Sequence, residues 1–292
     1  MEIANFTGHY RLQLECMHIL RNVPIKRFQA KHINDIIEEL DQLVAAGGAP
    51  HVRDVFLADG DAMTLPTGKL EAILDAINDR LPKVRRVSSY CLPRNVRGKS
   101  VEALSRLRSK GLALVYVGCE SGDDAVLSAV KKGETAATSL EALEKLKEAG
   151  IKRSIMILLG LGGKEHSTNH AINSADLCSQ AKPEYLSVLT TSFPRGKSRV
   201  EQGYKENIES TIAFEELNAR ESLEELKIFM ETLDIPQGEK TIFRSDHASN
   251  YLVLKGRLGR DKERLTAELQ RVLDAPPSDD SINLRPEWAR GL

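Results

Sequence analysis

The sequence predicts an α/β protein built around a parallel sheet. Short apolar runs alternate with longer amphipathic segments, and they lie about 30 to 40 residues apart, which leaves room for a helix in each gap. Several runs, such as VYVG and IMILLG, are almost continuously hydrophobic, as expected of strands covered on both faces. No GxGxxG motif opens the first helix, which disfavours the dinucleotide-binding arrangement. A (β/α) barrel and a doubly wound sheet both fit this pattern.

The expected strands are residues 10–15, 55–58, 86–90, 114–120, 155–159 and 186–191. The segments between them repeat apolar residues at helical spacing, and three end just before a glycine: Gly47, Gly111 and Gly150. After about residue 196 the alternation stops. A long helix over 214–233, a strand in TIFRS and a last helix over 261–273 are expected there. The sequence thus predicts a main part, residues 1–200, and a C-terminal extension, residues 201–292.

Composition excludes several classes of protein. Apolar residues make up 41% of the 292 residues and charged residues 28%, and the net charge of −1 does not favour a nucleic-acid or membrane surface. No run approaches the roughly 18 to 20 apolar residues of a membrane span, and the first residues do not resemble a secretory signal. The four cysteines have no close pair, which indicates a reducing compartment. We therefore expect a cytoplasmic protein.

Acidic, hydroxyl and glycine residues follow the expected strands. The carboxyl ends of parallel strands line the ligand site of such folds, so these residues are the candidate contacts. Turn formation alone would also favour Asp and Gly at these positions. The residues concerned are Asp59, Gly60, Asp61, Ser89, Glu120, Ser121, Gly160, Gly162 and Gly163.

The residue types at these strand ends favour one kind of ligand. Asp61 and Glu120 offer acceptors for an ammonium group or for ribose hydroxyls. Three glycines in the run from residue 160 to 163 would let a flat ring or a phosphate approach the backbone. The run GLGGKE lacks the P-loop spacing, and GCESG places its serine one position too late for the GxSxG hydrolase motif. The pattern favours a nucleoside that carries an amino acid.

Five stretches, in this order, resemble one known family: VFLADGDAMTLPT, SSYCLPRNV, LVYVGCESGDDAVL, GIKRSIMILLGLGG and FRSDHASNYL. The chain is similar to the radical S-adenosylmethionine superfamily, in the branch related to oxygen-independent coproporphyrinogen oxidases and the elongator catalytic subunit. The resemblance implies a partial (β/α)6 TIM-like barrel with a C-terminal α/β extension closing it. It also implies S-adenosylmethionine and a [4Fe–4S] cluster as cofactors, and an electron donor such as flavodoxin or ferredoxin. The family chemistry is reductive cleavage of the cofactor, followed by hydrogen abstraction from a substrate.

The resemblance also implies roles for individual residues. Asp59-Gly60-Asp61 takes the place of the family's Gly-Gly-Glu, which holds the methionine amino group. Ser89 and Glu120-Ser121 would face the ribose and methionine end. Gly160, Gly162 and Gly163 would lie along the adenine.

The cluster loop departs from the family pattern. A CxxxCxxC loop supplies three thiolates, but with Cys16 as the middle ligand the other two positions are Leu12 and Ile19. Residues 1–26 are therefore expected to be a degenerate cluster-loop region, with Cys16 as the one candidate metal ligand. Two explanations compete: a cluster-less descendant that still binds a nucleoside, or an active enzyme whose first 16 or so residues are mis-started or frameshifted.

Three functions follow from these alternatives. The chain is expected to be a radical enzyme of this superfamily, a cluster-less pseudoenzyme that binds the cofactor or a partner, or an ordinary barrel lyase or transferase with a similar rim.

Overall fold

The computed structural model describes residues 9–13, 30–58, 60–193, 196–207, 213–276 and 284–290. The chain consists of two compact units, each held together by contacts among its own residues. The first unit consists of Met1–Gly118 and Glu141–Arg153, and the second of Cys119–Leu140 and Ser154–Leu292. Each unit alternates strands and helices, so the predicted α/β class is confirmed.

The first unit contains four parallel strands in chain order: β1 (His9–Gln13), β2 (Asp54–Ala58), β3 (Arg86–Cys91) and β4 (Leu112–Glu120), whose last two residues belong to the second unit. The register pairs Leu57 of β2 with Ser89 of β3, and Ser89 with Val115 of β4. The four apolar runs expected here as strands are confirmed within a few residues.

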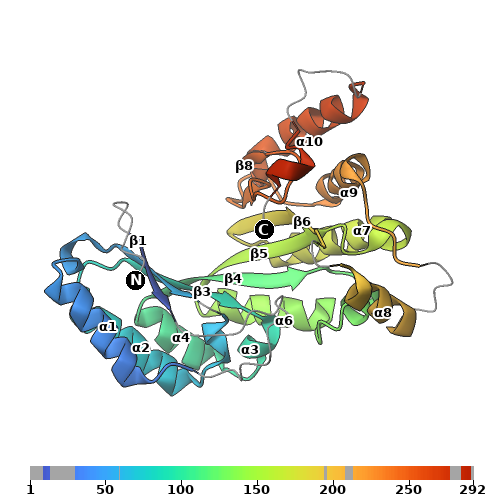
Figure 1. The fold of residues 1–292 in the computed structure, drawn as a ribbon. Coiled ribbons are helices and arrows are strands. Elements are labelled where there is room, and N and C mark those ends of the chain that lie inside the picture. Colours follow the sequence, from blue (N-terminus) through green and yellow to red (C-terminus); the bar gives the residue numbers. More distant parts are fainter. Residues whose placement is uncertain are drawn as a thin grey trace. The chain divides into compact units, whose positions relative to one another are not determined.

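Helices accompany these strands, as the 3.6-residue spacing predicts. They are α1 (Ile33–Ala45), α2 (Thr67–Arg80), α3 (Pro93–Arg97), α4 (Val101–Ser109) and the one-turn 3₁₀ helices η1 (Ala49–His51) and η2 (Ala62–Thr64). Helices α1, α2 and α4 pack in a row (Figure 1). The periodic apolar residues of α2, Leu70, Ile73, Leu74 and Ile77, are all buried.

The second unit contains the last four strands of the chain. Strands β5 (Lys152–Leu159, paired from Ser154), β6 (Tyr185–Thr190) and β7 (Ile242–Arg244) are parallel, and β8 (Lys255–Arg257) is antiparallel to β7. The strand expected in TIFRS is confirmed as β7. Strand β8 was not expected, because its three residues, Lys-Gly-Arg, have no apolar run.

The helices of the second unit are α5 (Asp124–Ala129), α6 (Ala136–Glu148, entering the first unit at Glu141), α7 (Gly163–Ala181), α8 (Ser198–Asn207), α9 (Ala219–Thr232), α10 (Leu258–Asp274) and the 3₁₀ helix η3 (Glu287–Ala289). The helix expected from 214 begins only at Ala219, because Asn218 and Glu221 form a capping box that starts it there. No helix within the described ranges is long and apolar enough to cross a bilayer.

Candidate functional site

Asp61 follows the first unit's strand β2 as the N-cap of η2, and its side chain is held by three hydrogen bonds. Oδ1 accepts a hydrogen bond from the Met63 amide at 2.8 Å, which caps η2. Oδ2 accepts from the Leu92 amide at 2.5 Å and from Nδ2 of Asn95 at 2.6 Å. The carboxylate therefore joins the end of β2 to the chain that follows β3. Asp59 lies outside the described residues, and Gly60 has a φ of 134°, a conformation that favours glycine.

Burial dominates the electrostatics at this strand end. Desolvation raises the pKa of Asp61, against the opposing effect of its hydrogen bonds and of the Lys99 ammonium. Lys99 donates to the Met63 carbonyl at 2.6 Å, and burial lowers its pKa. Ser89 on the neighbouring strand is also buried, and its hydroxyl donates to the Tyr90 carbonyl at 2.9 Å.

In the second unit, Glu120 and Ser121 end β4 in a tightly fixed turn. Glu120 has a left-handed φ of 66°, and its carboxylate lies 2.8 Å from Nζ of Lys132, a partner that the sequence did not indicate. A side chain at Gly122 would place its Cβ 2.2 Å from the Asn173 carbonyl oxygen. The glycine after Ser121 is therefore required by the close approach of α7.

The three glycines that follow β5 are each explained by contacts within the chain. A Cβ on Gly160 would lie 2.8 Å from Oγ1 of Thr191, and one on Gly163 would lie 2.9 Å from the ring of Phe214. Both glycines have a left-handed φ, 79° and 58°. At Gly162 a Cβ would lie 3.0 Å from the His166 backbone. A ligand ring could approach this turn only from the sides that these atoms leave free.

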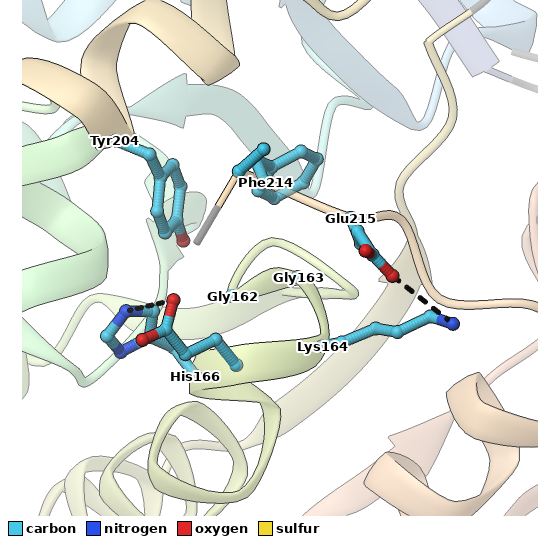
Figure 2. Close-up of a pocket in the computed structure, with 9 residues that line it drawn as sticks. Gly162, Gly163, Lys164, His166, Tyr204, Phe214 and Glu215 are labelled. Atoms are coloured by element: carbon cyan, nitrogen blue, oxygen red, sulfur yellow. Dashed lines mark ion pairs between the residues drawn. The ribbon is translucent and has the colours of Figure 1, made fainter. Parts of the chain in front are cut away.

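A cavity of about 250 Å³ opens beside this turn at the start of α7 (Figure 2). Tyr204 and Phe214 form an aromatic wall, with ring centroids 5.0 Å apart. The Lys164 ammonium lies 3.6 Å from the Glu215 carboxylate at the rim. Nε2 of His166 is buried there without a hydrogen-bond partner among the described residues. The cavity thus combines apolar walls with a few polar groups, as small-molecule sites do.

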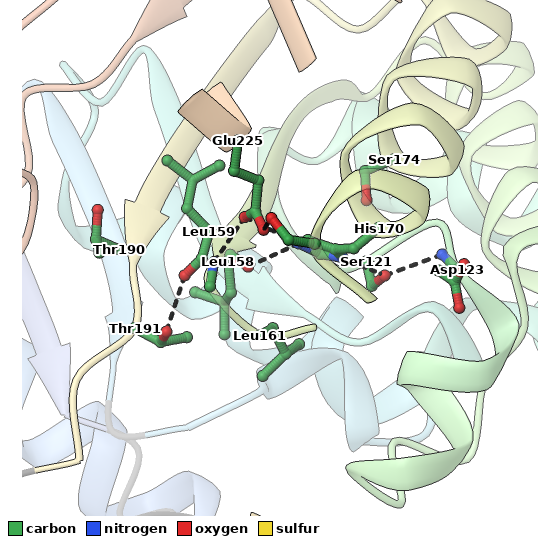
Figure 3. A network of polar contacts seen from close by, with 12 residues as sticks. Ser121, Asp123, Leu158, Leu159, Leu161, His170, Ser174, Thr190, Thr191 and Glu225 are labelled. Atoms are coloured by element: carbon green, nitrogen blue, oxygen red, sulfur yellow. Dashed lines mark hydrogen bonds and ion pairs between the residues drawn. The ribbon is translucent and has the colours of Figure 1, made fainter. Parts of the chain in front are cut away.

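A buried polar network lies behind the turn, and the sequence did not reveal it (Figure 3). Nε2 of His170 lies 2.9 Å from the Leu158 carbonyl oxygen, which can only accept, so this nitrogen carries the proton. Nδ1 then accepts from the Ser121 hydroxyl at 2.8 Å. Glu225 of α9 accepts from the Gly160 amide at 2.6 Å and from the Ser167 hydroxyl at 2.5 Å.

Ser121, His170 and Glu225 include the residue types of a hydrolytic triad but do not form one. The side chains of His170 and Glu225 have no exposed surface, and Ser121 is buried as well, so no substrate can reach the hydroxyl. The His170 nitrogen nearer to Glu225 is 3.8 Å from the carboxylate and is already bonded to Leu158. The network is a scaffold for the turns at Ser121 and Gly160.

The cysteines do not fit an iron–sulfur cluster. Cys91, Cys119 and Cys178 are buried in the core, and burial raises the pKa of Cys119 to about 12 and that of Cys178 well above its usual value. Within the described ranges no three His, Cys, Asp or Glu residues are grouped to hold a metal ion. Cys16 lies outside those ranges, and no second cysteine stands near it in the sequence.

More than half of the chain matches one known protein family. Residues 16–175 match the model of the "Radical SAM superfamily". The heme chaperone HemW of Bacillus subtilis (strain 168) is 24% identical over 149 residues, which are 49% of this chain and 39% of HemW. The chain thus spans well under half the length of that relative.

Two solved structures share the fold. Coproporphyrinogen III oxidase (HemN) from Escherichia coli, described as a radical SAM enzyme, has a TM-score of 0.52 at 13% identity, over 77% of this chain and 51% of that one. Elp3 from the archaeon Methanocaldococcus infernus has a TM-score of 0.52 at 14% identity, over 90% of this chain and 64% of that one. These likenesses confirm the predicted fold class, an α/β partial (β/α)6 barrel.

Proposed function

Because the chain belongs to the radical SAM superfamily, we propose that it binds S-adenosylmethionine at the carboxyl ends of its strands. The observation that carries this proposal is the extent of the family match. Residues 16–175 contain every residue that the sequence predicts at the ligand. The expected contacts are Asp59, Gly60, Asp61, Ser89, Glu120, Ser121, Gly160, Gly162 and Gly163.

The residues of the second unit are chemically suited to this cofactor. The Glu120 carboxylate accepts hydrogen bonds, as ribose hydroxyls and an ammonium group require. The cavity beside Gly162 offers aromatic surface for a planar base. When bound, S-adenosylmethionine supplies an activated sulfonium whose carbon–sulfur bonds can be broken. The chain's own part is to bind and orient it, and we propose that residues 201–292 help to close its site.

The cysteine set does not fit the cluster that would activate the cofactor, so we derive no radical step for this chain. The proposed function is cofactor binding by a polypeptide without its own cluster. This corresponds to the pseudoenzyme alternative among the functions that the sequence predicts, and an electron donor has no place in it.

Replacing Glu120 by glutamine is expected to weaken binding of S-adenosylmethionine about tenfold, because a charge-assisted acceptor becomes a neutral one. The dissociation constant would be measured by isothermal titration calorimetry. Glu206→Gln is the matched control, because Glu206 also pairs with a lysine, Lys131 at 2.6 Å, but on an exposed surface. Equal affinity in the wild type and Glu120→Gln would remove Glu120 from the site. No binding by the wild type would reject the proposed function.

Anaerobic reconstitution with iron and sulfide is expected to load the wild type no more than the Cys16→Ser variant. A single thiolate cannot hold a cluster that needs three. Iron and sulfide content and visible absorbance would be measured on both proteins after desalting. A full cluster complement in the wild type that is lost in Cys16→Ser would favour the radical enzyme over the proposal.

A further inference from the structure

The amide of Gly160 has an unusual hydrogen-bond partner. This residue directly follows β5, and its left-handed φ turns the chain toward α7. Its N–H is satisfied by a carboxylate oxygen of Glu225, from a helix about 65 residues later in the chain. The other carboxylate oxygen accepts from the hydroxyl of Ser167, in the second turn of α7. One side chain of α9 thus fixes both ends of the turn that leads from β5 into α7.

We propose that Glu225 is a positioning residue for the ligand site, and that its protonation state sets how firmly the turn at residues 160–163 is held and therefore how tightly the ligand binds. The part about the ligand rests on the proposed function. The part about the turn depends only on the contacts of Glu225.

The surroundings of Glu225 supply no compensating cation. His170 of α7 is 3.8 Å away and neutral, because its protonated nitrogen donates to a carbonyl and burial lowers its pKa to about 4. Tyr204 of α8 is the other titratable group influenced by Glu225, and Asp123 acts on His170. From α10, which also packs on α9, Lys262 donates to backbone carbonyls at the C-terminal end of α9. No lysine or arginine in the described chain pairs with Glu225.

Both protonation states of Glu225 are compatible with its contacts. In the ionised form each oxygen accepts one hydrogen bond, and the bond from Gly160 is charge-assisted. In the neutral form the proton on Oε2 is donated to Ser167, while Oε1 still accepts from Gly160 through a weaker bond. Burial outweighs these hydrogen bonds and raises the pKa of Glu225 to about 7. The folded turn therefore favours the neutral form, and ionisation near neutrality loosens it.

Glutamine at position 225 imitates the neutral form. Its carbonyl oxygen can accept from Gly160 and its amide can donate to Ser167, but it cannot ionise. Glu224→Gln is the matched control, because Glu224 precedes Glu225 on α9 but is exposed and paired with Arg220. Glu225→Ala removes the partner of the Gly160 amide altogether.

The first experiment needs no ligand. Amide hydrogen exchange of the peptide that covers residues 159–167 would be followed from pH 6 to 8.5, with the intrinsic pH dependence removed. Protection is expected to fall about tenfold across this range in the wild type and in Glu224→Gln, because opening of the turn exposes Glu225 and lets it ionise freely. It is expected to stay level in Glu225→Gln and to be lost in Glu225→Ala. The same fall in Glu225→Gln as in the wild type would overturn the positioning role.

The second experiment measures the dissociation constant of S-adenosylmethionine over the same pH range. Wild type and Glu224→Gln are expected to lose affinity about fivefold relative to Glu225→Gln between pH 6 and 8.5, because ionisation of buried Glu225 loosens the turn. Any titration of the ligand itself is common to all three proteins. If the dissociation constants of the wild type and Glu225→Gln change with pH in parallel, Glu225 does not influence ligand binding. If no protein binds the ligand while the exchange pattern appears, the proposed function fails and the positioning of the turn stands.

Discussion

Replacing Asp61 by asparagine is expected to lower the free energy of unfolding by about 3 kcal/mol. The carboxylate accepts three hydrogen bonds, two of them at the same oxygen, from Leu92 and Asn95. An asparagine has one acceptor oxygen, so its amide nitrogen must face at least one of the three donors. A buried donor left without an acceptor keeps its full desolvation cost. Urea denaturation followed by circular dichroism would measure the loss.

Asp75→Asn is the control for this change. Asp75 lies on α2 in the same unit and pairs with Lys110 across an exposed surface, where an ion pair contributes little. A much smaller loss is expected there. Equal losses in the two variants would contradict the structural role of Asp61 between β2 and β3.

Replacing Glu225 and His170 by glutamine, one at a time, is expected to give opposite pH dependences of the free energy of unfolding. The folded-state pKa of Glu225 is raised from 4.5 to about 7, so its contribution to stability is complete below pH 4.5 and is lost as the pH rises to 7. The folded-state pKa of His170 is lowered from 6.5 to about 4, so its contribution is complete above pH 6.5 and is lost as the pH falls to 4. Each shift corresponds to about 3 kcal/mol.

In the wild type the pH dependences of these two contributions nearly cancel between pH 4.5 and 6.5. Glu225→Gln is expected to remove the contribution that falls with rising pH. The free energy of unfolding of this variant should therefore increase by up to about 3 kcal/mol from pH 4.5 to 6.5. His170→Gln, whose amide can still donate to Leu158, is expected to show a decrease of similar size. Urea denaturation at half-unit steps of pH would measure both profiles, with Glu224→Gln as control. A Glu225→Gln profile parallel to that of the wild type would contradict the buried, neutral state of Glu225.

The strands could be predicted because their signal is local. Runs such as IMILLG are apolar at consecutive positions, and only a strand covered on both faces requires this over so short a length. Strand β8 could not be predicted, since its three residues are fixed by pairing with β7 and not by their own propensity. The apolar residue Phe214 predicts an earlier start for α9, but the capping box between Asn218 and Glu221 begins the helix at Ala219.

Glu225 was missed for a related reason. It stands in the run LEELK beside Glu224, and two adjacent glutamates usually indicate an exposed helical face. The available signal was its spacing: Glu225 lies four residues before Phe229 and three after Ser222, and both are buried. A glutamate on the apolar face of a helix indicates a buried partner, but the sequence does not name that partner.

The sequence by itself determined the order of strands and helices, the family, the positions of the glycines and acidic residues at the strand ends, and the lack of a three-cysteine loop. These properties depend on neighbours in the chain, and hydrophobic periodicity and motif spacing record them directly. Only the tertiary structure decided what those residues contact: Asp61 caps η2 and binds the chain after β3, the glycines make room for α7 and Phe214, and Glu225 completes the turn after β5. Such contacts join segments about 30 to 65 residues apart, and their energy comes from burial and hydrogen-bond geometry that exist only once the chain has folded.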